Sequence, residues 1–342
     1  IQPGLTLLNV LEYSNPAGRR YFVLAIDEAG EIVWYRRINK LALAMSVDEQ
    51  RRIYTTNGSL TAVRIDPYGQ TTTEWPVDTL GISSVHHEVR PTQDGGMAVL
   101  TTDLEVIDGW SMPPIFDERS FNIVGDRFAV FDADGSQIWS WSLLDHIDPL
   151  EHHTPDLHMA FWEMPPYLDV DTPKDWSHAN TLIPSGDNWM ASFRNLDWII
   201  EVNPTTDEIE WVFGPNGDFA LAEGSRWFSR QHRPSRLSNG NLLVYDNGLD
   251  RADAVEDEEA FSRVVEYTLD FETMTASEVW SWDGGEPYIC TIAGGVSRLE
   301  NGNHLINDGA IHDGMKWRSE RWQPHYSGRI REIAGTDEPT VL

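Results

Sequence analysis

The sequence is poor in cysteine, in lysine and in long apolar runs, and each shortage excludes a class of protein. A single cysteine, Cys290, rules out a disulfide within the chain. Lysine occurs only at Lys40, Lys174 and Lys316, so nearly all basic residues are arginines. No uninterrupted apolar run is long enough to span a bilayer, and we therefore expect no membrane insertion.

Positive charge is scarce as well. The chain has 25 Lys and Arg against 55 Asp and Glu, a net charge of −30 at pH 7. Such a surface repels a phosphate backbone, so we expect no nucleic-acid partner. Acidic, lysine-poor surfaces suit proteins that stay soluble in high salt, where repulsion is screened. An ordinary acidic protein is the alternative, and composition does not choose between the two.

The first residue is Ile1, and no basic and apolar leader opens the chain. We therefore expect an exported protein, periplasmic or extracellular, whose signal peptide was removed upstream of this residue. A cytoplasmic location stays open, and the sequence indicates no oligomeric state.

One phrase recurs along the chain: a strand-like run turns on Asp or Asn and then reaches a tryptophan. It reaches Trp34 in AIDEAGEIVW, Trp75 in RIDPYGQTTTEW, Trp141 in VFDADGSQIWSW, Trp211 in EVNPTTDEIEWVF and Trp282 in YTLDFETMTASEVWSW. Apolar residues alternate on both sides of each turn, as half-buried antiparallel strands require. Each phrase is therefore predicted to be a β-hairpin.

A second predicted hairpin precedes the first in the later units. Its phrases are HEVRPTQDGGMAVL, HANTLIPSGDNWMASF, HRPSRLSNGNLLVY and GVSRLENGNHLI. Gly and Asn in their turns supply the positive φ angles needed where two strands reverse. Six units of two coupled hairpins predict an all-β fold, a six-bladed β-propeller with four-stranded antiparallel blades. A β-sandwich is the alternative, but it does not explain the coupled repeat.

The predicted blades make one domain over residues 1–342. Their approximate ranges are 6–38, 40–77, 84–143, 176–213, 230–282 and 293–333. Two segments, at about 104–126 and 144–175, do not fit the repeat and are predicted to be insertions that form a lid or rim. We expect the N-terminal run LTLLNVLE to close the ring beside the last strands.

Three histidines fall at one repeated position. His87, His178 and His232 each stand eight residues before the glycine that reverses the first hairpin of their blade. We expect their imidazoles to converge at one face of the propeller. Arg194 stands eight residues after the reversal in the fourth blade, which should return it to the same face with Asn195 beside it.

A fixed cation among three imidazoles predicts a pocket that binds an anion. Two other interpretations stay open. Each histidine could simply hydrogen-bond a neighbouring backbone group, or the three could hold a catalytic zinc ion. Arg194 disfavours zinc because a guanidinium repels a metal cation. The sequence therefore predicts no metal and no other cofactor.

These motifs resemble those of the bacterial arylsulfotransferase family, whose members use an aryl sulfate rather than a nucleotide as donor. The resemblance covers about residues 84–310 and rests on HHEVRPTQDGG, DWSHANTLIPSGDNWMASFRNLDWIIEVNP, WVFGPNGDF, SRQHRPSRLSNGNLLVYDNG and GGVSRLENGNHLI. It implies a six-bladed propeller, in agreement with the repeat. It also implies a small-molecule aryl sulfate donor and a phenolic acceptor.

The resemblance also implies roles for single residues. His232 in SRQHRPS matches the family's nucleophile, which would form a sulfohistidine intermediate. His178 and Arg194 match its partner histidine and arginine. His86 and His87 match its earlier histidine pair, with His87 the participant in catalysis and His86 a substrate-binding residue.

Further substrate-binding residues are expected beside these motifs. They are Asn180, Asn195, Trp176, Trp227 and Phe228. The three aromatic residues could stack on an aryl ring, although packing inside the blades is an equal alternative. One histidine must exchange a proton with the phenolic oxygen, and the sequence does not choose between His87 and His178.

The chain departs from the family pattern at several points. Glu88 follows the histidine pair where the family often has Asp, and the N-terminal β-sandwich and the disulfide of some members are missing. The range of acceptors is therefore open. Two other functions also stay open: a propeller polysaccharide lyase or hydrolase that uses His and Arg near a sugar carboxylate, and a propeller that binds a ligand without catalysis.

Overall fold

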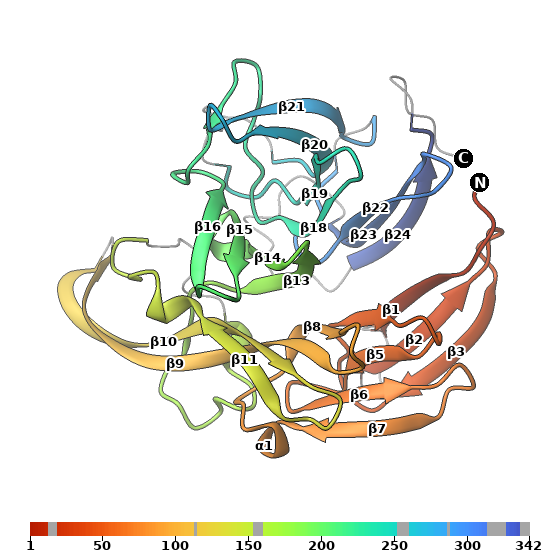
Figure 1. Ribbon diagram of the computed structural model, residues 1–342, viewed down its shortest axis with the longest axis horizontal. Helices are drawn as coiled ribbons and strands as arrows, with labels where there is room; N and C mark the ends of the chain where they lie inside the picture. The colour runs from red at the N-terminus through yellow and green to blue at the C-terminus, as the bar shows by residue number, and fades with distance from the viewer. Residues whose placement is uncertain are drawn as a thin grey trace. The chain divides into compact units, whose positions relative to one another are not determined.

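The computed structural model describes residues 1–12, 19–112, 115–152, 160–251, 260–285, 288–312 and 326–335. Their strands form six antiparallel sheets, which follow one another along the chain as the blades of a six-bladed β-propeller (Figure 1). The prediction of an all-β propeller with six blades is confirmed. No helix in these ranges is long and apolar enough to cross a membrane.

The first two sheets are formed by residues before the first predicted site motif. The first sheet contains β1 (Thr6–Glu12), β2 (Arg20–Ile26) and β3 (Ile32–Ile38). The second contains β4 (Met45–Val47), β5 (Ile53–Thr56), β6 (Thr61–Ile65) and β7 (Thr71–Pro76), and the helical turn α1 (Val77–Leu80) follows it.

The third and fourth sheets carry the first site motifs. The third contains β8 (His86–Pro91), β9 (Met97–Met112), β10 (Ile115–Phe131) and β11 (Gln137–Ser142), and β12 (Lys174–Asp175) pairs with β10 in parallel. The fourth contains β13 (Ala179–Ser185), β14 (Asn188–Phe193), β15 (Trp198–Asn203) and β16 (Glu208–Phe213).

The last two sheets complete the described chain. The fifth contains β18 (His232–Arg236), β19 (Leu242–Asp246), β20 (Arg263–Asp270) and β21 (Thr275–Trp282), and β17 (Ala220–Leu221) pairs with β21 in parallel. The sixth contains β22 (Gly295–Arg298), β23 (His304–His312) and β24 (Tyr326–Ile333).

The prediction of four antiparallel strands in a blade is confirmed for the second to fifth sheets, of which the third and fifth each carry one additional parallel strand. In the described residues, the first and sixth sheets have three strands. The extra strands β12 and β17 have two residues each and pair in parallel, so no hairpin turn marks them in the sequence. The predicted repeat therefore located the blades better than it counted their strands.

The two segments outside the repeat differ from each other. Residues 104–126 lengthen β9 and β10, which pair from Phe131 with Met97 out to Ile115 with Met112. Residues 144–175 contain most of the 3₁₀ turn η1 (Leu143–Asp145), the 3₁₀ turn η2 (Ala160–Trp162) and β12. Residues 153–159 of this segment lie outside the described ranges. The role of either segment as a lid or rim stays a prediction.

In the described residues, the N-terminal run LTLLNVLE pairs within the first sheet and not, as expected, with the last strands. Its residues form β1, which pairs with β2 from Thr6 opposite Ile26 to Glu12 opposite Arg20. The contact with the sixth sheet is made instead by Gln2, whose backbone N–H donates to both carboxylate oxygens of Glu332 at 2.9 and 3.0 Å.

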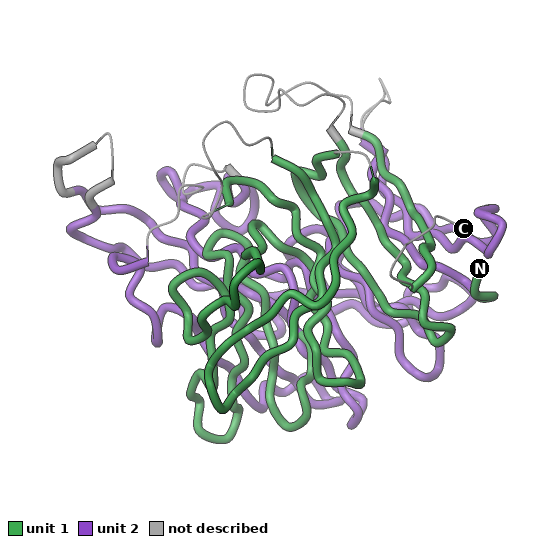
Figure 2. The backbone as a smooth tube through the Cα atoms, turned by 90° about the horizontal axis from the view of Figure 1, so that it is seen from above, with its two compact units in different colours: residues 1–4, 183–342 green, residues 5–182 purple. Residues whose placement is uncertain are grey.

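The chain divides into two compact units, which Figure 2 shows in green and purple. Unit 1 comprises residues 1–4 and 183–342, and unit 2 comprises residues 5–182. His86, His87 and His178 belong to unit 2, whereas Arg194 and His232 belong to unit 1. The prediction of a single domain stays a prediction.

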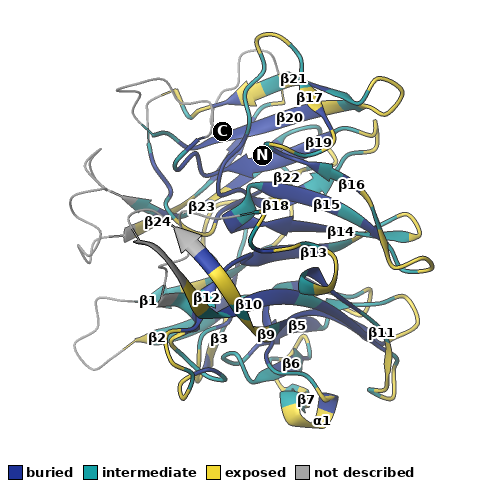
Figure 3. Cartoon of the chain, turned by 90° about the vertical axis from the view of Figure 1, so that its left-hand side faces the viewer, coloured by how far each residue is buried: buried dark blue, intermediate teal, exposed yellow. Residues whose placement is uncertain are grey.

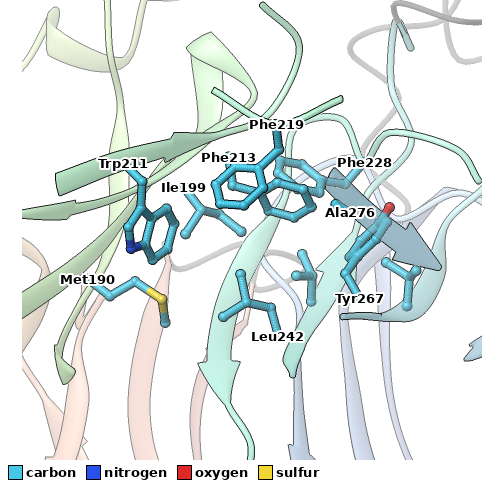
Figure 4. Packing of buried hydrophobic residues seen from close by; sticks show 11 residues of the cluster. Met190, Ile199, Trp211, Phe213, Phe219, Phe228, Leu242, Tyr267 and Ala276 are labelled. Carbon is cyan, nitrogen blue, oxygen red and sulfur yellow. The ribbon is translucent and has the colours of Figure 1, made fainter. Parts of the chain in front are cut away.

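Each unit has its own apolar core beneath the strands that carry site residues. In unit 1, Phe213 contacts Phe228 and Tyr267 edge to face at 5.4 and 5.2 Å between ring centroids (Figure 4). In unit 2, Val89, Val99 and other buried residues of the second and third sheets form a cluster. Figure 3 shows much of β19 and β20 in the dark blue of buried residues. Such packing fixes the strands, because large-to-small changes in a core cost several kcal/mol, roughly 2–5 for Leu to Ala.

Candidate active site

The backbone is left-handed at two of the three predicted histidines. His87 has φ 48° and His178 has φ 52°. His87 follows His86 inside a β-bulge, since the pairing of β8 with β9 shifts between His86 and Val89. His178 stands immediately before β13. A left-handed residue other than glycine costs of order 1–3 kcal/mol, and such strain concentrates at functional sites.

His232 differs from the other two although its distance from the reversal glycine is the same. It pairs with Tyr245 in the ladder of β18 and β19, and the left-handed residue of its bulge is Arg233, with φ 45°. In the third sheet the ladder position before the bulge belongs to His86, which pairs with Leu100. All three histidines therefore stand at or beside the start of the first hairpin strand of their sheet, but His232 has the ladder position that belongs to His86 in the third sheet, because a count of residues does not register a bulge.

In unit 2, a buried carboxylate lies behind His178. Its Nδ1 is 2.5 Å from Oδ2 of Asp175, and both side chains are buried. The other carboxylate oxygen, Oδ1, accepts a hydrogen bond of 3.1 Å from Nε1 of Trp162. Because a carboxylate only accepts, Nδ1 of His178 carries the proton, and Nε2 is the nitrogen that can exchange one.

A second carboxylate reaches His87 through His86. Nε2 of His86 lies 3.2 Å from Oδ1 of Asp126 and 3.3 Å from the carbonyl of Thr101, and both partners are acceptors. Nδ1 of His86 is 2.9 Å from Nδ1 of His87. With a proton on its Nε2, neutral His86 accepts from Nδ1 of His87. Since His86 is only 1% exposed, it supports His87 from within the sheet.

The structure brings His87 and His178 together within unit 2. Their ring centroids are 4.9 Å apart, and the ring of Phe161 lies 5.4 Å from His87 and 4.6 Å from His178. Trp162 packs edge to face on His86 at 5.2 Å. Phe161 and Trp162 come from the segment 144–175, so this segment supplies part of the histidine environment. The sequence analysis did not single them out.

In unit 1, neutral oxygen atoms lie behind His232. Its Nδ1 is 2.7 Å from Oδ1 of Asn247 and 3.1 Å from the carbonyl of Arg230. Nδ2 of Asn247 donates to the carbonyls of Cys290 and Ala293 at 2.8 and 2.9 Å, which fixes the orientation of the amide. Both neighbours of Nδ1 are therefore acceptors. Neutral His232 carries its proton on Nδ1 and has its lone pair on Nε2.

Arg194 and Asn195 lie in the short turn η3 (Arg194–Leu196) that follows β14. They are 3% and 2% exposed, and Nη1 of Arg194 donates to Oδ1 of Asn195 at 2.7 Å. Arg230 holds this turn: its Nη1 donates to the carbonyl of Asn195 at 3.1 Å and to Oδ1 of Asp197 at 3.2 Å. One arginine thus ties the turn of Arg194 to the loop that precedes His232.

Asp197 completes this clamp. The backbone N–H of Arg230 donates to its Oδ1 at 2.6 Å. Burial raises the pKa of Asp197, and the nearby guanidinium of Arg230 opposes that rise. The turn that presents Arg194 is therefore fixed by an ion pair whose charges are mostly removed from water.

The remaining predicted residues are buried. Asn180 is 4% exposed, and Trp176 is fully buried and donates from Nε1 to the carbonyl of His152 at 2.9 Å. Phe228 belongs to the apolar core of unit 1, and Trp227 packs against that core. These contacts favour blade packing for the three aromatic residues. Their stacking on a substrate ring stays a prediction.

Four supporting residues escaped the sequence analysis. They are Asp126, Asp175, Arg230 and Asn247. Three of them stood inside the quoted phrases: Asp175 in DWSHAN, Arg230 in SRQHRPS and Asn247 in VYDNG. Asp126 had no such signal, because it comes from the middle of β10. In the described ranges, no group of three His, Cys, Asp or Glu side chains is arranged to hold a metal ion.

The chain resembles several solved structures, and the likeness with TM-score above 0.5 supports the fold. The chain is similar to a protein of unknown function from Bacteroides caccae, with TM-score 0.53 and 13% identity over 98% of this chain and 91% of that one. It also matches the β-propeller domain of Cps50 (Swd1) from Myceliophteria thermophila, with TM-score 0.44 and 10% identity over 100% of this chain and 88% of that one. No curated protein sequence matches it.

A family model extends the likeness over nearly the whole chain. The model of the arylsulfotransferases (ASST) matches residues 2–338. That range includes every histidine, arginine and carboxylate described above. The motif resemblance is thereby confirmed, and the protein belongs to the arylsulfotransferase (ASST) family.

Proposed function

We propose that the protein moves a sulfuryl group from a phenolic sulfate ester to a phenolic acceptor through a sulfohistidine at His232. The observation that carries the proposal is the pair of acceptors at Nδ1 of His232, at 2.7 and 3.1 Å. They hold the imidazole in the tautomer whose Nε2 has a lone pair. A neutral imidazole with a fixed tautomer is a nucleophile ready for attack.

In the first half-reaction, Nε2 of His232 attacks the sulfur of the donor. The new S–N bond forms as the ester S–O bond breaks, and the departing phenolic oxygen takes a proton from the enzyme. Positive charge develops on the His232 ring during attack. The carbonyl of Arg230 and Oδ1 of Asn247 stabilise that charge through the Nδ1 proton.

In the second half-reaction, the oxygen of an acceptor phenol attacks the sulfur of sulfo-His232. The S–N bond breaks, the phenolic proton passes to the enzyme, and His232 returns to its neutral form. The sulfuryl group resembles a transferring phosphoryl group, whose charge is spread over its outer oxygens. We propose that Arg194 and His178 hold those oxygens, with His87 assisting.

Arg194 suits this role because its side chain is already positioned. A guanidinium presents donors in a planar fork, and its hydrogen bond to Asn195 restricts its rotamers. The Arg230 clamp prevents the turn from moving as charge develops. Assignment of residues of both units to one reaction rests on the family's motifs and on the spacing of the histidines in the repeat.

The decisive experiment is incubation with p-nitrophenyl sulfate and no acceptor. We expect a burst of one p-nitrophenol per enzyme and one sulfuryl group on His232, located by peptide mapping. His232→Asn removes the burst, whereas His146→Asn, a change in the segment after β11, keeps it. A sulfuryl group found only on another residue contradicts the proposal. Phenol release that needs no acceptor and never forms a sulfo-enzyme supports a hydrolase.

A further inference from the structure

We propose that Asp175 is a positioning residue that makes His178 the acid and base of both half-reactions. The inference rests on the proposed function and selects between His87 and His178. Asp175 is fully buried on β12, and it reaches Nδ1 of His178 at 2.5 Å. No substrate can touch this carboxylate, so it acts only through the imidazole.

The position of Asp175 is fixed from several sides. Its backbone pairs with Val124 of β10, and the next N–H, of Trp176, donates to the carbonyl of Val124 at 3.2 Å. Nε1 of Trp162 holds Oδ1 at 3.1 Å, which leaves Oδ2 directed to His178. The carboxylate therefore orients the ring and determines that Nε2 exchanges protons.

A carboxylate at Nδ1 stabilises the imidazolium that forms when Nε2 takes up a proton. The chemistry needs such a group. Protonated His178 gives its proton to the departing phenolic oxygen while His232 is sulfated, and neutral His178 takes a proton from the acceptor phenol while His232 is released. Charge and protons balance over the two steps, and the enzyme stores one proton between turnovers.

The Nδ1 atoms of the other two histidines contact neutral groups. Nδ1 of His87 faces the imidazole of His86, and Asp126 lies one ring further away. Nδ1 of His232 faces an amide and a peptide carbonyl. The nucleophile must be neutral and the acid must carry a proton, so these partners match His232 to attack and His178 to proton transfer.

The test uses Asp175→Asn and a series of aryl sulfates whose phenols range from weakly to strongly basic. In single turnovers, we expect sulfo-His232 formation to slow by roughly 10²- to 10⁴-fold for the most basic leaving group, as loss of general acid catalysis predicts. The loss should be below about 10-fold for p-nitrophenyl sulfate, because nitrophenolate leaves without a proton. Asp175→Glu, which restores the charge, should recover part of the rate.

Two matched variants keep the test decisive. Trp162→Phe removes the hydrogen bond to Oδ1 of Asp175 and should give a smaller loss with the same dependence on the leaving group, even if Asp175→Asn fails to fold. Asp126→Asn alters the carboxylate behind His86 and should show no such dependence. The assignment would be overturned if Asp175→Asn slowed sulfo-His232 formation equally for all donors, or not at all. It would also be overturned if Asp126→Asn, rather than Asp175→Asn, slowed the donors with basic phenols the most. Failure of wild-type enzyme to sulfate His232 would instead contradict the proposed function.

Discussion

In unit 2, the imidazoles of His86 and His178 face buried carboxylates, whereas in unit 1 the imidazole of His232 faces an amide and a peptide carbonyl. Unit 1 also has carboxylates that are largely removed from water. Asp197, whose side chain is 13% exposed, pairs with Arg230, and the fully buried Asp246 pairs with Arg251 and Arg263. The difference lies in their partners. In unit 1, Asp197 and Asp246 pair with arginines, whereas Nδ1 of His232 contacts the neutral oxygens of Asn247 and Arg230.

This contrast shows that the residue type alone does not decide what a histidine does. An imidazole with a carboxylate at Nδ1 is suited to carry charge, and one with neutral acceptors at Nδ1 is suited to attack as a neutral base. Under the proposed function, the partner atom behind the ring gives different roles to His178 and His232, which the sequence presents as equivalents.

The largest expected effect on stability comes from Arg230→Met, which removes the cation that pairs with Asp197 in unit 1. Asp197, whose side chain is only 13% exposed, would lose its ion-pair partner, so we expect the free energy of unfolding to fall by about 3–5 kcal/mol. Urea denaturation measures this loss. Arg236→Met removes the more exposed pair with Glu201 and should cost at most about 1 kcal/mol. Equal losses would show that the Arg230 pair behaves as a surface pair.

Asn247→Leu tests the neutral partner of His232. Nδ1 keeps the Arg230 carbonyl, but the carbonyls of Cys290 and Ala293 lose their donor, so we expect a loss of about 1–3 kcal/mol in stability. Sulfo-enzyme formation should slow by roughly 10- to 100-fold. Unlike Asp175→Asn, this loss should be the same for every leaving group in a single-turnover series.

The control for this change is Asn241→Leu at the far end of the same hairpin. Its side chain bonds Glu266 and not the histidine, so the rate should stay near that of the wild type. If Asn247→Leu slows only the donors with basic phenols, the division of roles between His232 and His178 is wrong.

In the described residues, His304 is hydrogen-bonded neither to a carboxylate nor to a neutral acceptor. Within the described residues its ring nitrogens have no hydrogen-bond partner, and the ring stacks on Trp280 at 4.3 Å. Burial, with help from Arg298, lowers the pKa of His304 to about 4. The unfolded value is about 6.5, so the stability from neutral His304 is present above pH 6.5 and is lost as the pH falls through 4.

Denaturation of the wild type and of His304→Phe from pH 7 to pH 3 measures this effect. The phenyl ring keeps the stack and cannot take a proton. We expect the variant to escape an acid loss of about 2–3 kcal/mol. Parallel curves over this pH range would show that His304 is not buried as a neutral ring.

Added salt should weaken the repulsion between surface charges and leave the interactions of buried charged groups nearly unchanged. With a net charge of −30, the folded chain repels itself over a screening length of about 30 Å at 0.01 M salt. Molar sodium chloride should raise the melting temperature by a few degrees, whereas the rate ratio of Asp175→Asn to wild type should not change, because buried pairs are screened little. A flat or falling melting temperature would contradict salt adaptation of the fold.

The sequence predicted the fold well because the fold repeats. Each hairpin ending in a tryptophan marks one blade, and the predicted ranges 176–213 and 230–282 begin within three residues of the strands β13 and β18, which start at Ala179 and His232. The short strands β12 and β17 escaped, since two-residue parallel pairings carry no turn and no alternation. Their partners are chosen by tertiary contacts rather than by local pattern.

Only part of the candidate site could be predicted. Counting from the reversal glycines singled out His87, His178 and His232 as candidates, but the count could not register that the bulges in β8 and β18 differ. The partners that distinguish these histidines come from elsewhere in the chain. Asp126 lies in the middle of β10 and Asn247 just after β19, with no spacing in common. Such partners become visible only when the chain is folded.

The left-handed backbone at His87 and His178 has a consequence for engineering. Glycine adopts positive φ without steric cost, so glycine at either position would relieve strain of roughly 1 kcal/mol. At His178, however, glycine would also leave the buried carboxylate of Asp175 without its imidazole partner, which costs more than the strain relieved. A randomised library screened for heat resistance alone is thus expected to enrich glycine at position 87 and to keep histidine at position 178. Thermostabilisation of this enzyme should hold these two codons constant and draw its gains from the exposed turns, where no chemistry competes.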